Sequence, residues 1–83
     1  MNFEPVIVIW KDITTKNGWN SQEEIDQFVM DEDECIVYQS GFLYEEDESQ
    51  LCLLNSYFKN KDLLGDITKI PKGAIVQIIK YGT

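Results

Sequence analysis

Two blocks of four carboxylates, Asp31–Glu34 and Glu45–Glu48, are the residues of this 83-residue chain whose type and spacing could do chemistry. They frame the apolar run Cys35–Tyr44 on both sides. Carboxylates at this density can hold a divalent cation, act as a catalytic acid and base, or meet a basic partner. They can also simply keep a strand soluble. The elements that carry them decide among these uses.

The length of the run between the blocks argues against a shared metal site. Residues 35–44 span about 30 Å as an extended strand, so one cation cannot use both blocks. A calcium-binding loop starting at Asp31 would place Cys35 and Phe42 where oxygen ligands are required. Weak Ca²⁺ or Mg²⁺ binding by a single block stays open, but we predict no dedicated metal site and no cofactor.

Catalytic residues are also sparse. The sequence has no His to activate a Ser or Cys nucleophile and no Arg to clamp a phosphate. Tandem acids in polar loops are solvated alike, so neither is tuned to hold a proton at neutral pH. We expect a protein that is not an enzyme.

The first block, Asp31–Glu34, is expected to finish a turn from a helix into a strand. If the following hairpin pairs Tyr44 with Gln50, Cys35 lies opposite Lys59. Lys59 and Lys61 then approach the first block and form a screened salt-bridge patch of small net worth.

The second block has no Lys within ten residues on either side. Two interpretations stay open. An acidic hairpin tip can blunt the strands against edge-to-edge association, or it can recognise a basic protein. In the second case the partner-binding residues are Tyr44, Glu45, Glu46, Asp47 and Glu48.

The overall charge favours a basic protein partner. Fifteen acids face seven Lys, which gives a net charge of −8. Such a surface repels nucleic-acid phosphates and anionic membranes, so we expect neither as a direct partner. No run approaches the ~20 apolar residues of a membrane span, and no signal peptide is recognisable. We therefore expect a cytoplasmic protein.

Local patterns predict five strands and one helix. The helix spans about residues 21–30, where Ser21 and Glu24 fit a capping box and Ile25, Phe28 and Val29 form an apolar stripe expected to face the core. The expected strands are Pro5–Trp10, Cys35–Tyr44, Leu51–Phe58, Asp66–Ile70 and Ala74–Tyr81. Short strands and tight turns predict a single α+β domain over residues 1–83, a small, strongly curved antiparallel β-barrel with one short N-terminal helix.

The second half of the chain resembles the Sm-like, or SH3-like, small barrels of RNA-binding rings. Gly41, Leu43 and Asp47 match the first motif of that family, and the second motif is matched by Lys72, Gly73, Val76 and Ile79. The resemblance implies a homo-oligomeric ring that binds a nucleotide-type molecule or RNA between subunits. The basic residues available for such an anion site are Lys59, Lys61, Lys69 and Lys72.

The whole chain is also similar to small uncharacterised proteins of phages and prophages. The similarity rests on "WKD" at residues 10–12, "GW" before the helix and "IPKG" at residues 70–73. It implies an accessory protein acting inside a bacterial host cell. We predict a non-enzymatic protein that docks on and modulates a host protein, for example a defence or nucleic-acid-handling factor. The alternatives are the ring-forming Sm-like oligomer and a purely structural virion or scaffold component.

Overall fold

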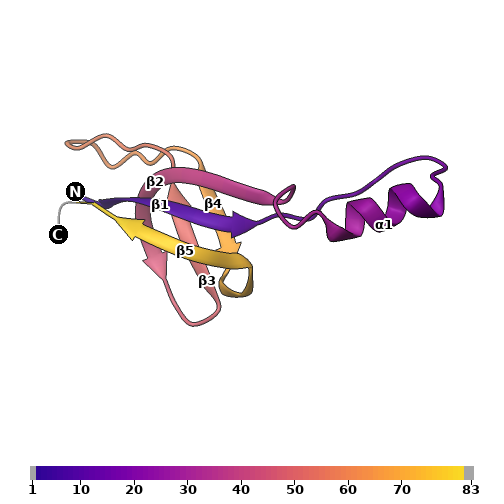
Figure 1. Cartoon of the computed structure of the whole chain (residues 1–83). Helices are drawn as coiled ribbons and strands as arrows, with labels where there is room; N and C mark the ends of the chain where they lie inside the picture. Colours follow the sequence, from indigo (N-terminus) through magenta and orange to yellow (C-terminus); the bar gives the residue numbers. More distant parts are fainter. Residues whose placement is uncertain (1, 82–83) are drawn as a thin grey trace.

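A five-stranded sheet and one helix form the part of the chain that the structure describes, residues 2–81 (Figure 1). The structure is a computed structural model. The β-branched run after Pro5 forms the first strand, and Ser21 caps the helix as predicted, its side chain accepting a hydrogen bond from the Glu24 N–H at 3.2 Å. The elements are β1 Glu4–Lys11, α1 Gln22–Met30, β2 Ile36–Glu46, β3 Gln50–Leu54, β4 Ile67–Pro71, the 3₁₀ helix η1 Lys72–Ala74 and β5 Ile75–Lys80.

All neighbouring strands in the sheet are antiparallel, in the order β4-β3-β2-β1-β5. The predicted α+β class is therefore confirmed. Among residues 2–81 the two edge strands, β4 and β5, are not hydrogen-bonded to each other, so the sheet stays open.

The sheet bends at β2, which changes partner along its length. Residues 36–43 of β2 pair with β1, and residues 42–46 pair with β3. At the crossing point Gly41 lies against β3, where an added Cβ would come within 2.7 Å of Leu53 Cγ and 2.9 Å of the Leu54 carbonyl oxygen. The close approach of the two strands thus requires glycine at this position.

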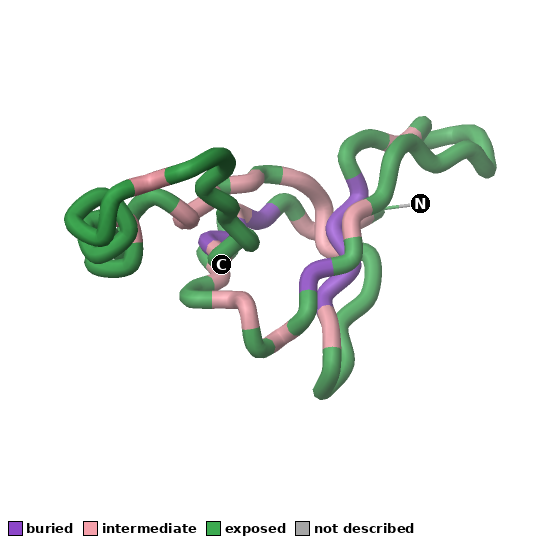
Figure 2. The backbone as a smooth tube through the Cα atoms, turned by 90° about the vertical axis from the view of Figure 1, so that its right-hand side faces the viewer, coloured by how far each residue is buried: buried purple, intermediate pink, exposed green. Residues whose placement is uncertain are grey.

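The main core cluster lies on one face of the curved sheet, and β3 is also buried at the intervening positions, Cys52 and Leu54. The fully buried side chains of the cluster come from alternate positions of β1 and β3 and from β4, and Figure 2 shows the buried stretches confined to the sheet. Trp10 from β1 and Leu43 from β2 pack against this cluster from its margin. The buried cluster consists of Val6, Val8, Leu51, Leu53 and Ile70.

The β2–β3 register differs from the predicted one. Phe42 lies opposite Leu54 and Glu46 opposite Leu51, with an irregularity at Tyr44, so the predicted pairing of Tyr44 with Gln50 was wrong. The turn is centred later in the chain than predicted, because β2 continues to Glu46. The bulge accounts for only one residue of the register.

The predicted third strand was too long, because β3 ends at Leu54 instead of Phe58. Residues 55–66 form a separate hairpin-like loop, in which the Gly65 N–H donates to the Ser56 carbonyl at 2.7 Å. This loop carries Lys59 and Lys61 to the end of the molecule opposite α1 (Figure 1). The predicted approach of these lysines to Asp31–Glu34 was therefore wrong.

Residues 12–35, here called the arm, project from the end of the sheet (Figure 1). The base of the arm is closed by a hydrogen bond from the Asp12 N–H to the Cys35 carbonyl, 2.8 Å long. The arm makes the molecule elongated, with extents of 56 × 26 × 21 Å and a radius of gyration of 16.7 Å, against ~12 Å for a compact chain of this length.

The helix α1 lies on the arm, and none of its residues is buried. The prediction that its apolar stripe faces the core was wrong: Val29 is 72% exposed and Ile25 39% exposed. The physical reason is the direction of the chain, because β1 and β2 carry the arm past the end of the sheet instead of across its face (Figure 1).

Candidate functional site

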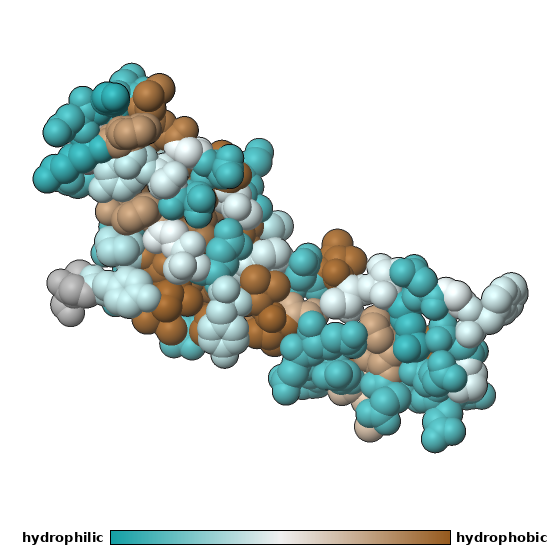
Figure 3. All heavy atoms as spheres, turned by 90° about the horizontal axis from the view of Figure 1, so that it is seen from above, coloured by the Kyte–Doolittle hydropathy of each residue, from teal (hydrophilic) through white to brown (hydrophobic). Residues whose placement is uncertain are grey.

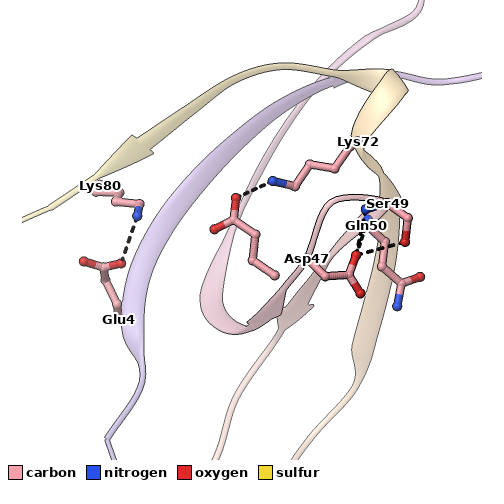
Figure 4. Close-up of polar contacts among 7 residues, drawn as sticks. Glu4, Asp47, Ser49, Gln50, Lys72 and Lys80 are labelled. Carbon is pink, nitrogen blue, oxygen red and sulfur yellow. Dashed lines mark hydrogen bonds and ion pairs between the residues drawn. The ribbon is translucent and has the colours of Figure 1, made fainter.

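The acidic tip, Glu45–Glu48, turns the chain from β2 into β3, and Asp47 organises that turn. One oxygen, Oδ1, accepts hydrogen bonds from the Ser49 N–H at 2.8 Å, the Ser49 hydroxyl at 2.9 Å and the Gln50 N–H at 2.9 Å (Figure 4). These bonds, the one from the Ser49 N–H foremost, hold the pKa of the Asp47 carboxyl below its usual value. Asp47 therefore serves the turn, in the manner of an Asx turn.

A second carboxylate of the tip is neutralised within the chain. Glu46 forms an ion pair with Lys72, whose backbone N–H also donates to the Ser49 carbonyl at 2.9 Å. The tip has no lysine close to it in the sequence, but folding brings Lys72 from the start of η1 to the β2–β3 turn. Glu45 and Glu48 are the exposed tip carboxylates for which the structure gives no such contact.

Tyr44 lies where β2 enters the tip and is 42% exposed. Its ring centroid is 5.5 Å from that of Phe3, which in turn meets Tyr57 edge-on at 5.0 Å. Together with Glu45 and Leu64, Tyr44 and Phe3 line a shallow, open depression. Its lining also includes Asp62 and thus combines two aromatic rings with two carboxylates.

The four lysines proposed as an anion site do not converge on one place. Lys72 follows the Pro71 end of β4, whereas Lys59 and Lys61 lie in the loop beyond its Ile67 end. The two ends of β4 are about 15 Å apart. Lys61 Nζ lies 5.1 Å from the centroid of the Phe58 ring, and Lys69 sits within β4, opposite Cys52.

The charge of the molecule is concentrated in the arm. Residues 12–35 contain eight carboxylates and one lysine, a net charge of −7, whereas the other 59 residues contain seven carboxylates and six lysines. Seen from above, the arm end at the right of Figure 3 is covered mostly by hydrophilic side chains. The acidic end of the molecule is therefore the arm, more than the tip.

Apolar side chains of the arm also face solvent. Trp19 is fully exposed, Ile13 is 89% exposed and Met30 is 73% exposed. Phe28 is half-buried and lines a depression of about 280 Å³ together with Glu24, Gln27, Asp31, Glu34 and Lys16. The sequence signal for this surface was the long acidic stretch around α1, which by itself does not reveal that the helix stands away from the core.

Two further features bear on chemistry in residues 2–81. No group of three or more Cys, His, Asp or Glu side chains there is arranged to hold a metal ion. Within the same residues no helix combines the length and apolar character needed to cross a membrane.

Comparison of the chain with protein-family models, with curated proteins and with solved structures gave no match. Function is therefore argued from the α+β fold and from the acidic surfaces described above.

Proposed function

We propose that this protein is a non-enzymatic acidic binding protein that docks on a protein with a basic surface. The observation that carries the proposal is the placement of charge: a net −7 lies in the arm, at one end of an elongated molecule. A charge distribution of this kind orients the molecule in the field of a basic partner and accelerates association. Aromatic side chains that face solvent near the carboxylates, such as Trp19 and Tyr44, suit a protein interface.

The biological setting we propose is that of a phage-type accessory protein acting on a host protein in the bacterial cytoplasm. Its support is the sequence similarity carried by residues 10–12 and 70–73. Proteins that handle nucleic acid present Lys and Arg to phosphates. An acidic protein can occupy such a surface, so a defence or nucleic-acid-handling factor fits the charge.

We also propose that the open sheet is a partial barrel of the small Sm-like or SH3-like type. Three features support this. Five antiparallel strands follow the order β4-β3-β2-β1-β5, Gly41 lets β2 bend closely over β3, and the three-residue helix η1 connects the two edge strands directly. Three residues bridge only about 6 Å in a 3₁₀ helix, so the sheet edges must approach each other there.

The test of the docking function is the salt dependence of complex formation. The purified tagged chain is used to capture proteins from a bacterial host lysate at low and at high salt, and the complexes are weighed by native mass spectrometry. We expect a 1:1 or 2:1 complex with a basic protein that is lost at high salt, because screening shortens the range of the attraction. Absence of a complex, or a complex indifferent to salt, would contradict the proposal.

A second candidate is a ring of identical subunits that binds a nucleotide-type molecule or RNA. The observation that favours it is the pair of open sheet edges, β4 and β5, which could join head to tail between copies. We expect native mass spectrometry of the chain alone to show a defined ring carrying extra mass. Charge reversal of Lys69 would then remove that mass, whereas a monomer would rule out this candidate.

A further inference from the structure

The arm exposes apolar side chains that do not contribute to the core of the sheet. Trp19 is fully exposed, and none of the nine residues of α1 is buried. Large aromatic side chains are the residues that most often anchor protein interfaces. An arm on which Trp19, Ile13 and Met30 face solvent is suited to contacting another molecule.

The short length of α1 also indicates that a partner covers it. Isolated helices shorter than ~12–15 residues are marginal in water, and most helices in proteins are stabilised by burying an apolar face. Here α1 has nine residues and a cap at Ser21, and Phe28, its best-covered side chain, is only half-buried. Covering Phe28 and Val29 with a partner would supply the missing stabilisation.

Charge decides what kind of partner can cover this face. The depression beside Phe28 is bordered by Glu24, Asp31 and Glu34, with a single Lys16. A guanidinium or ammonium group can lie on the aromatic ring and pair with these carboxylates. Two arms, each with a net charge of −7, would repel one another, which disfavours an arm-to-arm dimer.

A second groove lies at the base of the arm, where the arm meets the sheet. It is lined by Asp33 from the arm, by Ile36 and Tyr38 from β2, and by Val76 from β5. Tyr38 and Val76 are 73% and 55% exposed. The arm and the sheet therefore share a groove whose lining mixes a carboxylate with apolar and aromatic side chains.

We infer that the arm, and not the acidic tip, is the docking surface, and that its occupant is a segment of another protein in which Lys or Arg alternates with apolar side chains. The inference rests on the proposed docking function and assigns that function to residues 12–35. At the tip, Asp47 and Glu46 are occupied by contacts within the chain, which leaves fewer carboxylates for a partner. The arm offers both the larger charge and the exposed apolar anchors.

The experiment selects binders from a displayed library of random linear peptides against the full chain and measures the affinity of the enriched peptides for three variants. Trp19→Ala removes the aromatic anchor. The double variant Glu24→Gln and Glu34→Gln removes two charges from the arm. The matched control, Glu45→Gln with Glu48→Gln, removes two charges from the tip by the same substitution. Circular dichroism establishes that all three variants keep the fold.

We expect the enriched peptides to combine basic and apolar residues. Trp19→Ala and the arm pair should each weaken binding about tenfold, and the tip pair should change it less than about twofold. Bound peptide should also slow amide hydrogen exchange in α1. Basic peptides that are weakened as much by the tip pair as by the arm pair would overturn the arm as the docking surface while leaving the docking function standing.

Two other results are decisive. Enriched peptides without a basic surplus, or no enriched peptide at all, would overturn the arm as a site for such a segment, whereas the docking function is judged separately by the salt-dependent capture described above. Light scattering on the chain alone tests self-association: a dimer that Trp19→Ala converts to monomer would show that the occupant is a second copy, contrary to the inference.

Discussion

At the scale of single residues, Asp47 and Gly41 show how local chemistry fixes the region between β2 and β3. Asp47 holds the turn with three hydrogen bonds to one carboxylate oxygen. Gly41 lets the backbone of β2 approach β3 more closely than a side chain would permit. Both residues also belong to the pattern that resembles the Sm-like motif. The turn explains why position 47 is Asp, and the close approach of β3 explains why position 41 is Gly.

Asp47 should make stability depend on acidity. Its pKa is lowered on folding, so the unfolded chain binds more protons in the window between the lowered and the usual value. The contribution is therefore present above the usual pKa of about 4 and is lost as pH falls through the lowered value. Asp47→Asn keeps an acceptor oxygen but does not titrate. We expect lower stability at neutral pH and a shallower fall of the melting temperature in acid.

Thermal unfolding across the acid range measures this effect for the wild type and for Asp47→Asn. Glu48→Gln controls for the loss of one charge from the same tip. Melting curves that shift in parallel for the wild type and Asp47→Asn would mean that the hydrogen bonds at the turn do not carry the pH dependence.

Gly41→Ala should destabilise the sheet. The added Cβ meets Leu53 Cγ and the Leu54 carbonyl below 3.0 Å, and the carbonyl belongs to a paired strand that cannot easily move. Overpacking of this kind costs about 1–3 kcal/mol in the free energy of unfolding. Gly73→Ala is the matched control, because an added Cβ there meets nothing within 4 Å. Equal urea-unfolding midpoints for the two variants would contradict the argument.

At the scale of elements, α1 is separable from the sheet. It has a good N-cap at Ser21 but no buried residue, so its stability is local. The strands are the opposite case: Leu51 and Leu53 of β3 are in the core, and the register of β2 against β3 is held by that burial. The helix and the sheet should therefore respond independently to substitution.

Ser21→Ala tests this independence. Loss of the cap costs about 1 kcal/mol of helix stability. We expect faster amide hydrogen exchange in α1 and an unchanged melting temperature of the sheet, because no core residue lies on α1. A lowered sheet melting temperature would show that α1 supports the sheet after all.

At the scale of the whole molecule, charge and core are segregated. The arm carries a net charge of −7, and the buried cluster lies entirely in β1, β3 and β4. One part of the molecule therefore supplies stability, and another part supplies most of the electrostatic field.

Replacing residues 13–34 by a short turn should leave the sheet folded. Asp12 and Cys35 already meet through a 2.8 Å hydrogen bond, so a tight connection can join them. We expect a urea-unfolding midpoint close to that of the full chain. Leu53→Ala provides the contrast, since deleting a buried leucine costs about 2–5 kcal/mol. Failure of the shortened chain to fold would contradict the segregation of charge and core.

The sequence by itself determined the elements and much of their order. Runs of β-branched, aromatic and other apolar residues indicated the strands, and Ser21 with Glu24 marked the start of the helix. These signals act over a few residues, through backbone sterics, capping and side-chain alternation. They can therefore be recognised in the sequence without knowing the rest of the fold.

Only the tertiary structure decided which surfaces are exposed and which charges meet. The bulge at Tyr44 shifted the β2–β3 register, and folding brought Lys72 to Glu46 across 26 positions of the chain. The apolar stripe of α1 predicted a buried helix, since the same pattern serves a core or a partner. Whether this stripe is buried depends on the direction in which β1 and β2 leave the sheet. That direction is a property of the folded sheet and cannot be read from the residues of α1.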